Sequence, residues 1–189
     1  MALDARVQEL IAAGDLRGAA TEALRALGPQ VLRYLRSVLR SEADTADAFS
    51  QFAENLWTGL AGFRGQSALR TWAFRIARNV AANLRDEAWR RRGRPFATGE
   101  ASALALEIRT ASAVRAEQQL DALAKLREAL TDDERALLAL RVDQQLAWEE
   151  VADILSAEDA PVSAATLTKR FERLKDRLAR MARDQGLLG

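Results

Sequence analysis

Hydrophobic residues recur every three or four positions along most of the chain, which is the spacing of one face of an α-helix. The pattern predicts helix over residues 4–40, interrupted once at Gly28-Pro29, where the glycine ends one segment and the proline opens the next. A further helix is expected to begin among the capping residues of 41–47 and to end within 59–65. Its predicted buried stripe is Phe49, Phe52, Ala53, Leu56 and Leu60.

The next predicted helix has two contrasting faces, and Ser67 stands where it can cap the first turn. The face suited to a core carries Leu69, Trp72, Ala73, Ile76, Ala77, Val80 and Leu84. The opposite face carries arginines and two aromatic residues, namely Arg70, Arg75, Arg78, Arg85, Arg92, Phe74 and Trp89. Guanidinium groups interleaved with aromatic rings can hold phosphates and stack unpaired bases, so we hypothesise a nucleic-acid interface. The alternative is a solvated arginine-rich helix, because charge runs are common on helix surfaces.

Residues 95–113 lose the helical period and are predicted to form a linker. Helix resumes over 114–130, and Thr131 and Glu134 then have the spacing of a capping box. The helix that starts there is expected to bury Leu137, Leu138 and Val142. A short helix over 148–155 follows it.

The last predicted helix, over residues 163–183, is also amphipathic. Its apolar face carries Leu167, Phe171, Leu174, Leu178 and Met181, and its basic face carries Thr166, Lys169, Arg170, Arg173, Arg177 and Arg180. A short helix, a turn and a basic helix form a helix-turn-helix pattern, in which the second helix enters the major groove of DNA. A plain helical hairpin with a solvated basic face is the alternative.

Composition narrows the choice of fold and chemistry. Ten glycines, three prolines and a 49% hydrophobic content fit a nearly all-helical chain. With the predicted linker, we expect an all-α fold of two small helical domains joined by a flexible linker. The chain has no cysteine and no histidine, so we expect no metal site, no cofactor and no histidine-based catalysis. Adjacent acids occur at Asp132-Asp133, Glu149-Glu150 and Glu158-Asp159, but a cap, a helix start and a turn account for them, so we expect no enzyme.

The N-terminus lacks a signal-peptide pattern, and no apolar run approaches the ~20 residues that span a bilayer. The expectation is a cytoplasmic protein with no membrane partner. Although the formal net charge is only +1, positive charge is concentrated at two places, residues 64–94 and 161–183, with acidic stretches elsewhere. Two basic segments suggest two contacts with one polyanion.

Both basic segments resemble one known family. The segment FRGQSALRTWAFRIARNVAANLR resembles the region-2 signature of extracytoplasmic-function (ECF) sigma factors, a subfamily of the bacterial sigma-70 family. The segments LTDDERALLALRVDQQLAWEEVADIL and ATLTKRFERLKDRL are similar to its region 4. The resemblance implies a region-2-like domain over 1–94, a linker over 95–113 and a region-4-like helix-turn-helix domain over 114–189. It also implies three partners: core RNA polymerase, promoter DNA and an anti-sigma factor.

The same resemblance implies roles for individual residues. Region 2 holds core polymerase through its second helix, here with Asp47, Gln51, Glu54, Asn55 and Trp57. It melts and reads the minus-10 element with the following loop and helix, here with Phe63, Arg64, Gly65, Gln66, Ser67, Arg70, Arg75, Arg78, Asn79 and Arg85. Region 4 reads the minus-35 element, here with Ser163, Thr166, Lys169, Arg170, Arg173 and Arg177. Trp72, on the apolar face, is expected to pack in the core.

Three features depart from the family pattern. Ser50 and Gln51 stand where glutamine and glutamate are common, and Asn83 replaces a common aspartate. The turn of the helix-turn-helix, SAEDAPVSAA, is about twice the usual length. Two other functions remain open: a stand-alone helix-turn-helix transcription regulator, and a helical adaptor that binds no nucleic acid.

Overall fold

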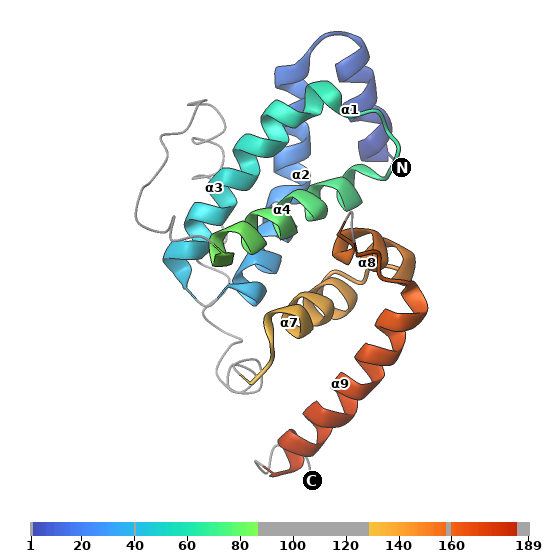
Figure 1. Cartoon of the computed structure of the whole chain (residues 1–189). Helices are drawn as coiled ribbons and strands as arrows, with labels where there is room; N and C mark the ends of the chain where they lie inside the picture. The colour runs from blue at the N-terminus through green and yellow to red at the C-terminus, as the bar shows by residue number, and fades with distance from the viewer. Residues whose placement is uncertain (1, 40, 87–128, 158–159, 185–189) are drawn as a thin grey trace. The chain divides into compact units, whose positions relative to one another are not determined.

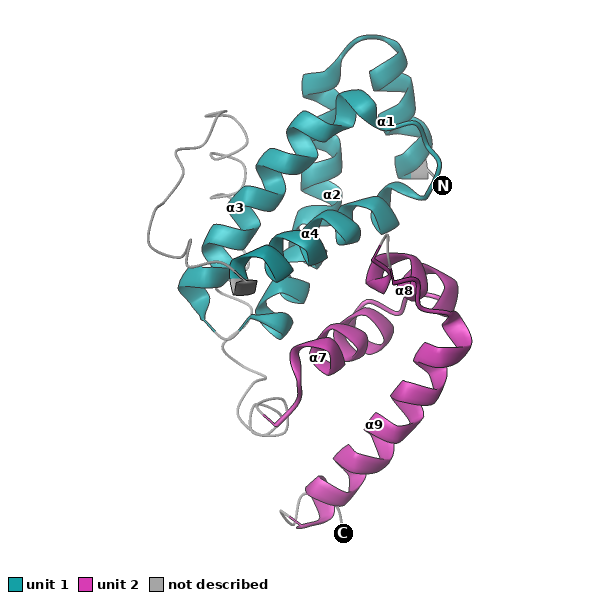
Figure 2. Cartoon of the chain, in the orientation of Figure 1, with its two compact units in different colours: residues 1–114 teal, residues 115–189 magenta. Residues whose placement is uncertain are grey.

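The computed structural model describes residues 2–39, 41–86, 129–157 and 160–184, and every regular element among them is a helix. The prediction of an all-α fold is therefore confirmed. The chain divides into two compact units, residues 1–114 (unit 1) and 115–189 (unit 2), which Figure 2 distinguishes by colour. The predicted linker, Trp89, Arg92 and nearly all of the predicted helix over 114–130 lie outside the described residues.

Unit 1 is built from α1 (Ala2–Ala12), α2 (Leu16–Val38), α3 (Glu42–Gly59), the 3₁₀ turn η1 (Leu60–Gly62) and α4 (Leu69–Asp86). Helix α2 packs against α1, α3 and α4, and α3 packs against α4 (Figure 1). The predicted stripe of α3 is confirmed, because Phe49, Phe52, Ala53, Leu56 and Leu60 are all fully buried. This core holds α3 and α4 side by side.

The predicted break at Gly28-Pro29 is wrong, because α2 runs through Pro29 without interruption. The chain turns earlier, where Gly14 has a φ of +78° and the Asp15 side chain accepts a hydrogen bond from the Gly18 amide at 2.8 Å. A proline inside a helix costs ~3 kcal/mol. Burial of neighbouring side chains such as Leu27 and Val31 stabilises by about 1.5–3 kcal/mol each and outweighs that cost.

The starts of α3 and α4 differ in how well the sequence predicts them. Ser41 caps α3 as expected, since its hydroxyl accepts a hydrogen bond from the Asp44 amide at 3.2 Å. The predicted cap of α4 at Ser67 is one residue too early. The Trp72 amide donates to the Ala68 carbonyl at 3.0 Å, which makes Ala68 the N-cap residue of α4.

Unit 2 contains α7 (Asp132–Leu138), the π-helical turn η3 (Ala139–Asp143), α8 (Trp148–Leu155) and α9 (Ala164–Asp184). The capping box is confirmed: the Thr131 amide donates to Glu134 Oε2 at 2.9 Å, and the Glu134 amide donates to Thr131 Oγ1 at 3.3 Å. The expectation that Val142 is buried is wrong, because its exposed fraction is 50%. The wider π turn shifts the register of the helix face, so Leu140 rather than Val142 enters the core.

The side chain of Ser156 links the two ends of the long turn between α8 and α9. The Ser156 hydroxyl accepts a hydrogen bond from the Val162 amide at 3.0 Å and donates to the Val162 carbonyl at 3.4 Å. The Ser163 hydroxyl then accepts from the Thr166 amide at 3.2 Å, at the position that caps α9. Leu167 and Leu174 of α9 are buried, so the predicted amphipathic helix forms.

Candidate nucleic-acid interface

Helix α4 places its apolar residues in the core of unit 1 and keeps part of its polar surface accessible. Leu69, Ala73, Ala77 and Val80 are buried. Of the four minus-10 arginines predicted on α4, Arg70, Arg75 and Arg78 are half-buried, and the side chain of Arg85 lies outside the described residues. Asn79 is exposed. Long arginine side chains can bury their stems and still present the guanidinium group to an anion.

The expectation that Phe74 projects from the basic face is wrong, because its ring is fully buried. It packs edge-on against Tyr34, with ring centroids 5.6 Å apart and planes at 88°. The Arg70 guanidinium lies over the Phe74 ring, 5.9 Å from its centroid. Because α4 packs against both α2 and α3, it buries a wider sector than a single apolar stripe.

The aromatic contact at the 63–67 loop is instead between Phe63 and Trp72, whose ring centroids are 5.0 Å apart. Both residues are half-buried, so Trp72 is only partly taken into the core. The loop of residues 63–67 begins at Phe63 and leads into α4. Its residues Arg64, Gly65 and Gln66 are exposed. Gly65 has a φ of +68°, a backbone conformation that side-chain-bearing residues rarely adopt.

The predicted polymerase-binding residues lie on α3. Asp47 and Asn55 are exposed, Gln51 and Trp57 are half-buried, and the Gln51 amide donates to Asn55 Oδ1 at 2.9 Å. Glu54 differs from expectation, since only 8% of its surface is exposed. Helix α3 packs against α2, α4 and η1, which leaves a narrower accessible face than the sequence pattern predicted.

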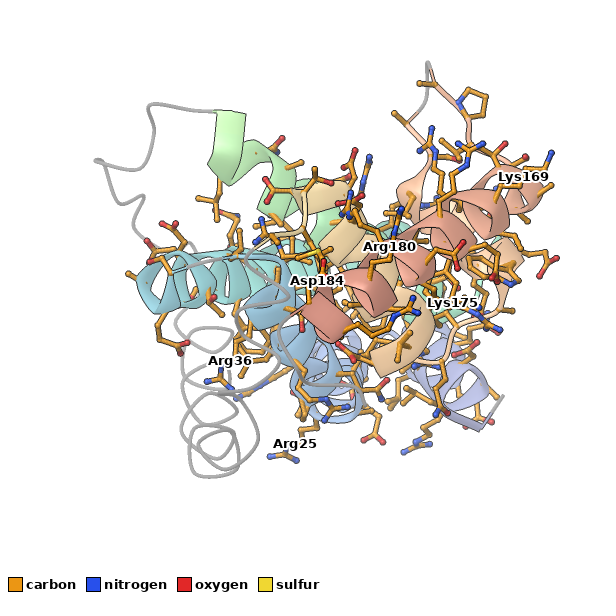
Figure 3. All side chains as sticks on the ribbon, turned by 90° about the horizontal axis from the view of Figure 1, so that it is seen from below. Arg25, Arg36, Lys169, Lys175, Arg180 and Asp184 are labelled. Carbon is orange, nitrogen blue, oxygen red and sulfur yellow. The ribbon has the colours of Figure 1, made fainter. Side chains whose placement is uncertain are left out.

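Helix α9 presents the predicted recognition residues to solvent. Ser163, Thr166, Lys169, Arg170 and Arg173 are exposed, and Arg177 is half-buried. Arg180, which belongs to the basic face but not to this set, is also exposed. Lys169 and Arg180 project from one side of α9 and Lys175 from another (Figure 3). The Ser163 and Thr166 hydroxyls are 2.9 Å apart at the first turn, close to the exposed end of the helix. A helix end with hydroxyl and guanidinium groups can contact base edges and phosphates.

Arg177 has a partner that the sequence does not reveal. Its guanidinium donates to Glu134 Oε2, and the nitrogen and oxygen are 2.5 Å apart. Glu134 therefore serves both the capping box of α7 and an ion pair that links α7 to α9. Partial burial raises the pKa of the Glu134 carboxyl, but the bonds from Arg177 and Thr131 outweigh it, and the pKa is lowered overall.

This ion pair predicts a pH dependence of the stability of unit 2. A lowered folded-state pKa stabilises the fold above the ordinary glutamate pKa of about 4.3, and that contribution is lost as the pH falls further. Glu134→Gln can keep the capping bond but loses the charge, so we expect it to lower the free energy of unfolding by roughly 0.5–1 kcal/mol at pH 7.

Urea denaturation at several pH values measures this effect, and Glu149→Gln is the matched control because Glu149 is an exposed acid on α8. The difference between Glu134→Gln and wild type should shrink as the pH falls below the ordinary glutamate pKa. An undiminished difference at low pH would mean that packing, and not the charge, accounts for the loss.

A second group of contacts within unit 2 also could not be predicted from the sequence pattern. The Arg141 guanidinium donates to the Leu146 carbonyl at 2.6 Å and lies 4.9 Å from the centroid of the Trp148 ring. Trp148 in turn packs edge-on against Phe171, with centroids 5.4 Å apart. These contacts join η3, α8 and α9, and so fix α9 against the rest of unit 2.

Among the described residues, no helix has both the length and the apolar character needed to span a membrane. Within the same ranges, no cluster of acidic side chains is arranged to hold a metal ion.

Residues 23–94 match the family described as Sigma-70 region 2. The chain is also 31% identical over 127 residues to the RNA polymerase sigma factor YlaC of Bacillus subtilis (strain 168), an alignment that covers 62% of this chain and 68% of that protein. The chain belongs to the ECF subfamily of the sigma-70 family. In this sigma-70-family protein, the matched region 2 contains α3, the 63–67 loop and α4, and it lies entirely within unit 1.

Proposed function

We propose that this sigma-70-family protein binds core RNA polymerase and directs initiation of transcription at particular promoters. The observation that carries the proposal is the surface formed by the 63–67 loop and α4. There an exposed loop with a left-handed glycine adjoins a helix whose apolar side is buried and whose described arginines, Arg70, Arg75 and Arg78, are half-buried. Such a surface suits a single strand, because arginines attract its phosphates and the loop can enclose an unpaired base.

In this proposal, unit 1 contains the region-2-like domain, which melts and reads the minus-10 element. Residues 63–67 hold a flipped base, Asn79 contributes an exposed amide to its reading, and Arg70, Arg75, Arg78 and Arg85 attract the backbone. Base stacking on aromatic or guanidinium planes contributes ~1–3 kcal/mol per base. With Phe74 buried, Phe63 is the ring best placed for that contact.

Unit 2 is proposed as the region-4-like domain, which reads the minus-35 element as duplex. The exposed first turns of α9 would enter the major groove with Ser163, Thr166, Lys169, Arg170 and Arg173. Because Arg177 is bonded to Glu134, we assign it a supporting role in holding α9 as well as a phosphate contact.

Core polymerase is proposed to bind the accessible face of α3, through Asp47, Gln51, Asn55 and Trp57. Glu54 is buried and is therefore assigned to the packing of α3 instead. An anti-sigma factor, the third partner that the resemblance implies, would compete for the same face. Sigma factors are initiation factors and not enzymes, so no chemistry is assigned to the chain.

A gel-shift experiment with fragments of the source genome separates a sigma factor from a stand-alone regulator. The protein alone is expected to bind duplex fragments weakly, and to select a subset of them only when core polymerase is added. Core polymerase without the protein is the control. Equally selective binding by the protein alone would favour the stand-alone regulator, and no salt-dependent binding under either condition would favour an adaptor.

A further inference from the structure

Helix α1 reaches the 63–67 loop through the side chain of Gln8. If Gly65 carried a Cβ atom, that atom would lie 2.4 Å from Gln8 Nε2 and 3.6 Å from Gln8 Cδ. The Gln8 carboxamide therefore occupies the space that a side chain at position 65 would need. Figure 1 shows the same proximity, since the connection from α3 to α4 passes beside α1.

The loop is also held at its start, by a different helix. The Trp72 ring of α4 packs against the Phe63 ring, with centroids 5.0 Å apart. It also lies so close to Gly59 that a Cβ there would be 3.1 Å from a ring carbon. The Phe63 amide donates to the Leu60 carbonyl at 3.1 Å. Trp72 thus fixes the entry to the loop, while Gln8 contacts its middle, where the chain makes its left-handed turn.

We propose that Gln8 is a positioning residue for the 63–67 loop, a role that rests on the proposed function of this loop in reading the minus-10 element. Gln8 precedes the residues that match Sigma-70 region 2, which begin at residue 23, so the loop is supported by a helix outside that match. The carboxamide restricts the backbone at Gly65 and keeps the loop in one conformation before DNA arrives. A loop ordered in advance loses less conformational entropy on binding and discriminates better between bases.

The experiment compares wild type with Gln8→Ala and, as matched control, Gln30→Ala, which removes the same carboxamide from α2 in the same unit. The backbone order parameter of Gly65 is measured by NMR on the full chain. We expect it to fall from the rigid range, about 0.85, to below about 0.6 in Gln8→Ala and to stay unchanged in Gln30→Ala. Gln8 is exposed, so the melting temperature of Gln8→Ala should match that of wild type.

The second readout is base preference. Each variant, combined with core polymerase, selects from a pool of random-sequence single-stranded DNA, and the preference at the most selective position is compared. We expect this preference to fall by about threefold or more in Gln8→Ala alone. A purely structural role would leave base preference unchanged.

The outcomes separate this inference from the proposed function. An unchanged Gly65 order parameter, or a loosened loop with unchanged base preference, would overturn the positioning role. If wild type with core polymerase selects no sequence at all, the proposed function itself fails, whatever the order parameters show. Loosening at Gly65 together with reduced preference, in Gln8→Ala only, supports the assignment.

Discussion

Phe74→Ala is expected to lower the free energy of unfolding of unit 1 by about 3–5 kcal/mol, the largest effect of a single substitution predicted for this protein. The Phe74 ring is fully buried and packs edge-on against Tyr34, so truncation removes an aromatic pair and leaves a cavity between α2 and α4. Urea denaturation of the full chain, followed by circular dichroism, measures the loss. Binding to single-stranded DNA should weaken only as far as the folded fraction falls.

Phe63→Ala is the matched control, because Phe63 is a half-buried phenylalanine of the same unit that lies at the loop. It should cost about 1 kcal/mol of stability and weaken binding of single strands in the folded protein. The reverse pattern, with Phe74→Ala stable but defective in binding, would show that Phe74 contacts bases after all.

Arg173→Ala is expected to reduce minus-35 discrimination by about 1–3 kcal/mol, which is roughly 5- to 150-fold in affinity. Arg173 is exposed on the leading half of α9, where its guanidinium can bond two acceptors on one guanine. Binding to core polymerase should not change, because the proposed polymerase contacts lie on α3. Competition between promoter fragments with intact and altered minus-35 elements, in the presence of core polymerase, measures the effect.

Arg183→Ala removes the same charge near the far end of α9, where the side chain bonds the Ala179 carbonyl of its own helix at 3.2 Å. It should reduce affinity for all fragments slightly and leave discrimination intact. If Arg173→Ala instead abolished binding to core polymerase, the roles assigned to the two units would be wrong.

The parts of the fold that the sequence predicts well are those fixed by local interactions. Ser41 and the pair Thr131 and Glu134 cap helices through hydrogen bonds between residues three positions apart. Their spacing in the sequence is therefore sufficient to predict these helix starts. The stripe of α3 was predicted for a similar reason, since a helix with one strongly apolar face buries that face. The bounds of α8, Trp148–Leu155, also match the prediction.

Several errors arise where a residue packs against neighbours that are distant in sequence. Phe74 and Glu54 are buried because α3 and α4 each pack against more than one element, which no helical period reveals. The pairing of Arg177 with Glu134 joins residues 43 positions apart. At Gly28-Pro29 the local rule predicted a break, but burial on both sides of the proline keeps α2 continuous. Local helix propensity alone determines where a helix begins or ends only when tertiary packing is weak.

The most direct test of the central claim is transcription by purified core polymerase from a library of fragments of the source genome, with and without the protein. The account predicts discrete transcripts that depend on the protein and begin downstream of a shared pair of sequence elements, together with co-purification of the protein with core polymerase. If no transcript depends on the protein and it does not co-purify with core polymerase, the account is contradicted.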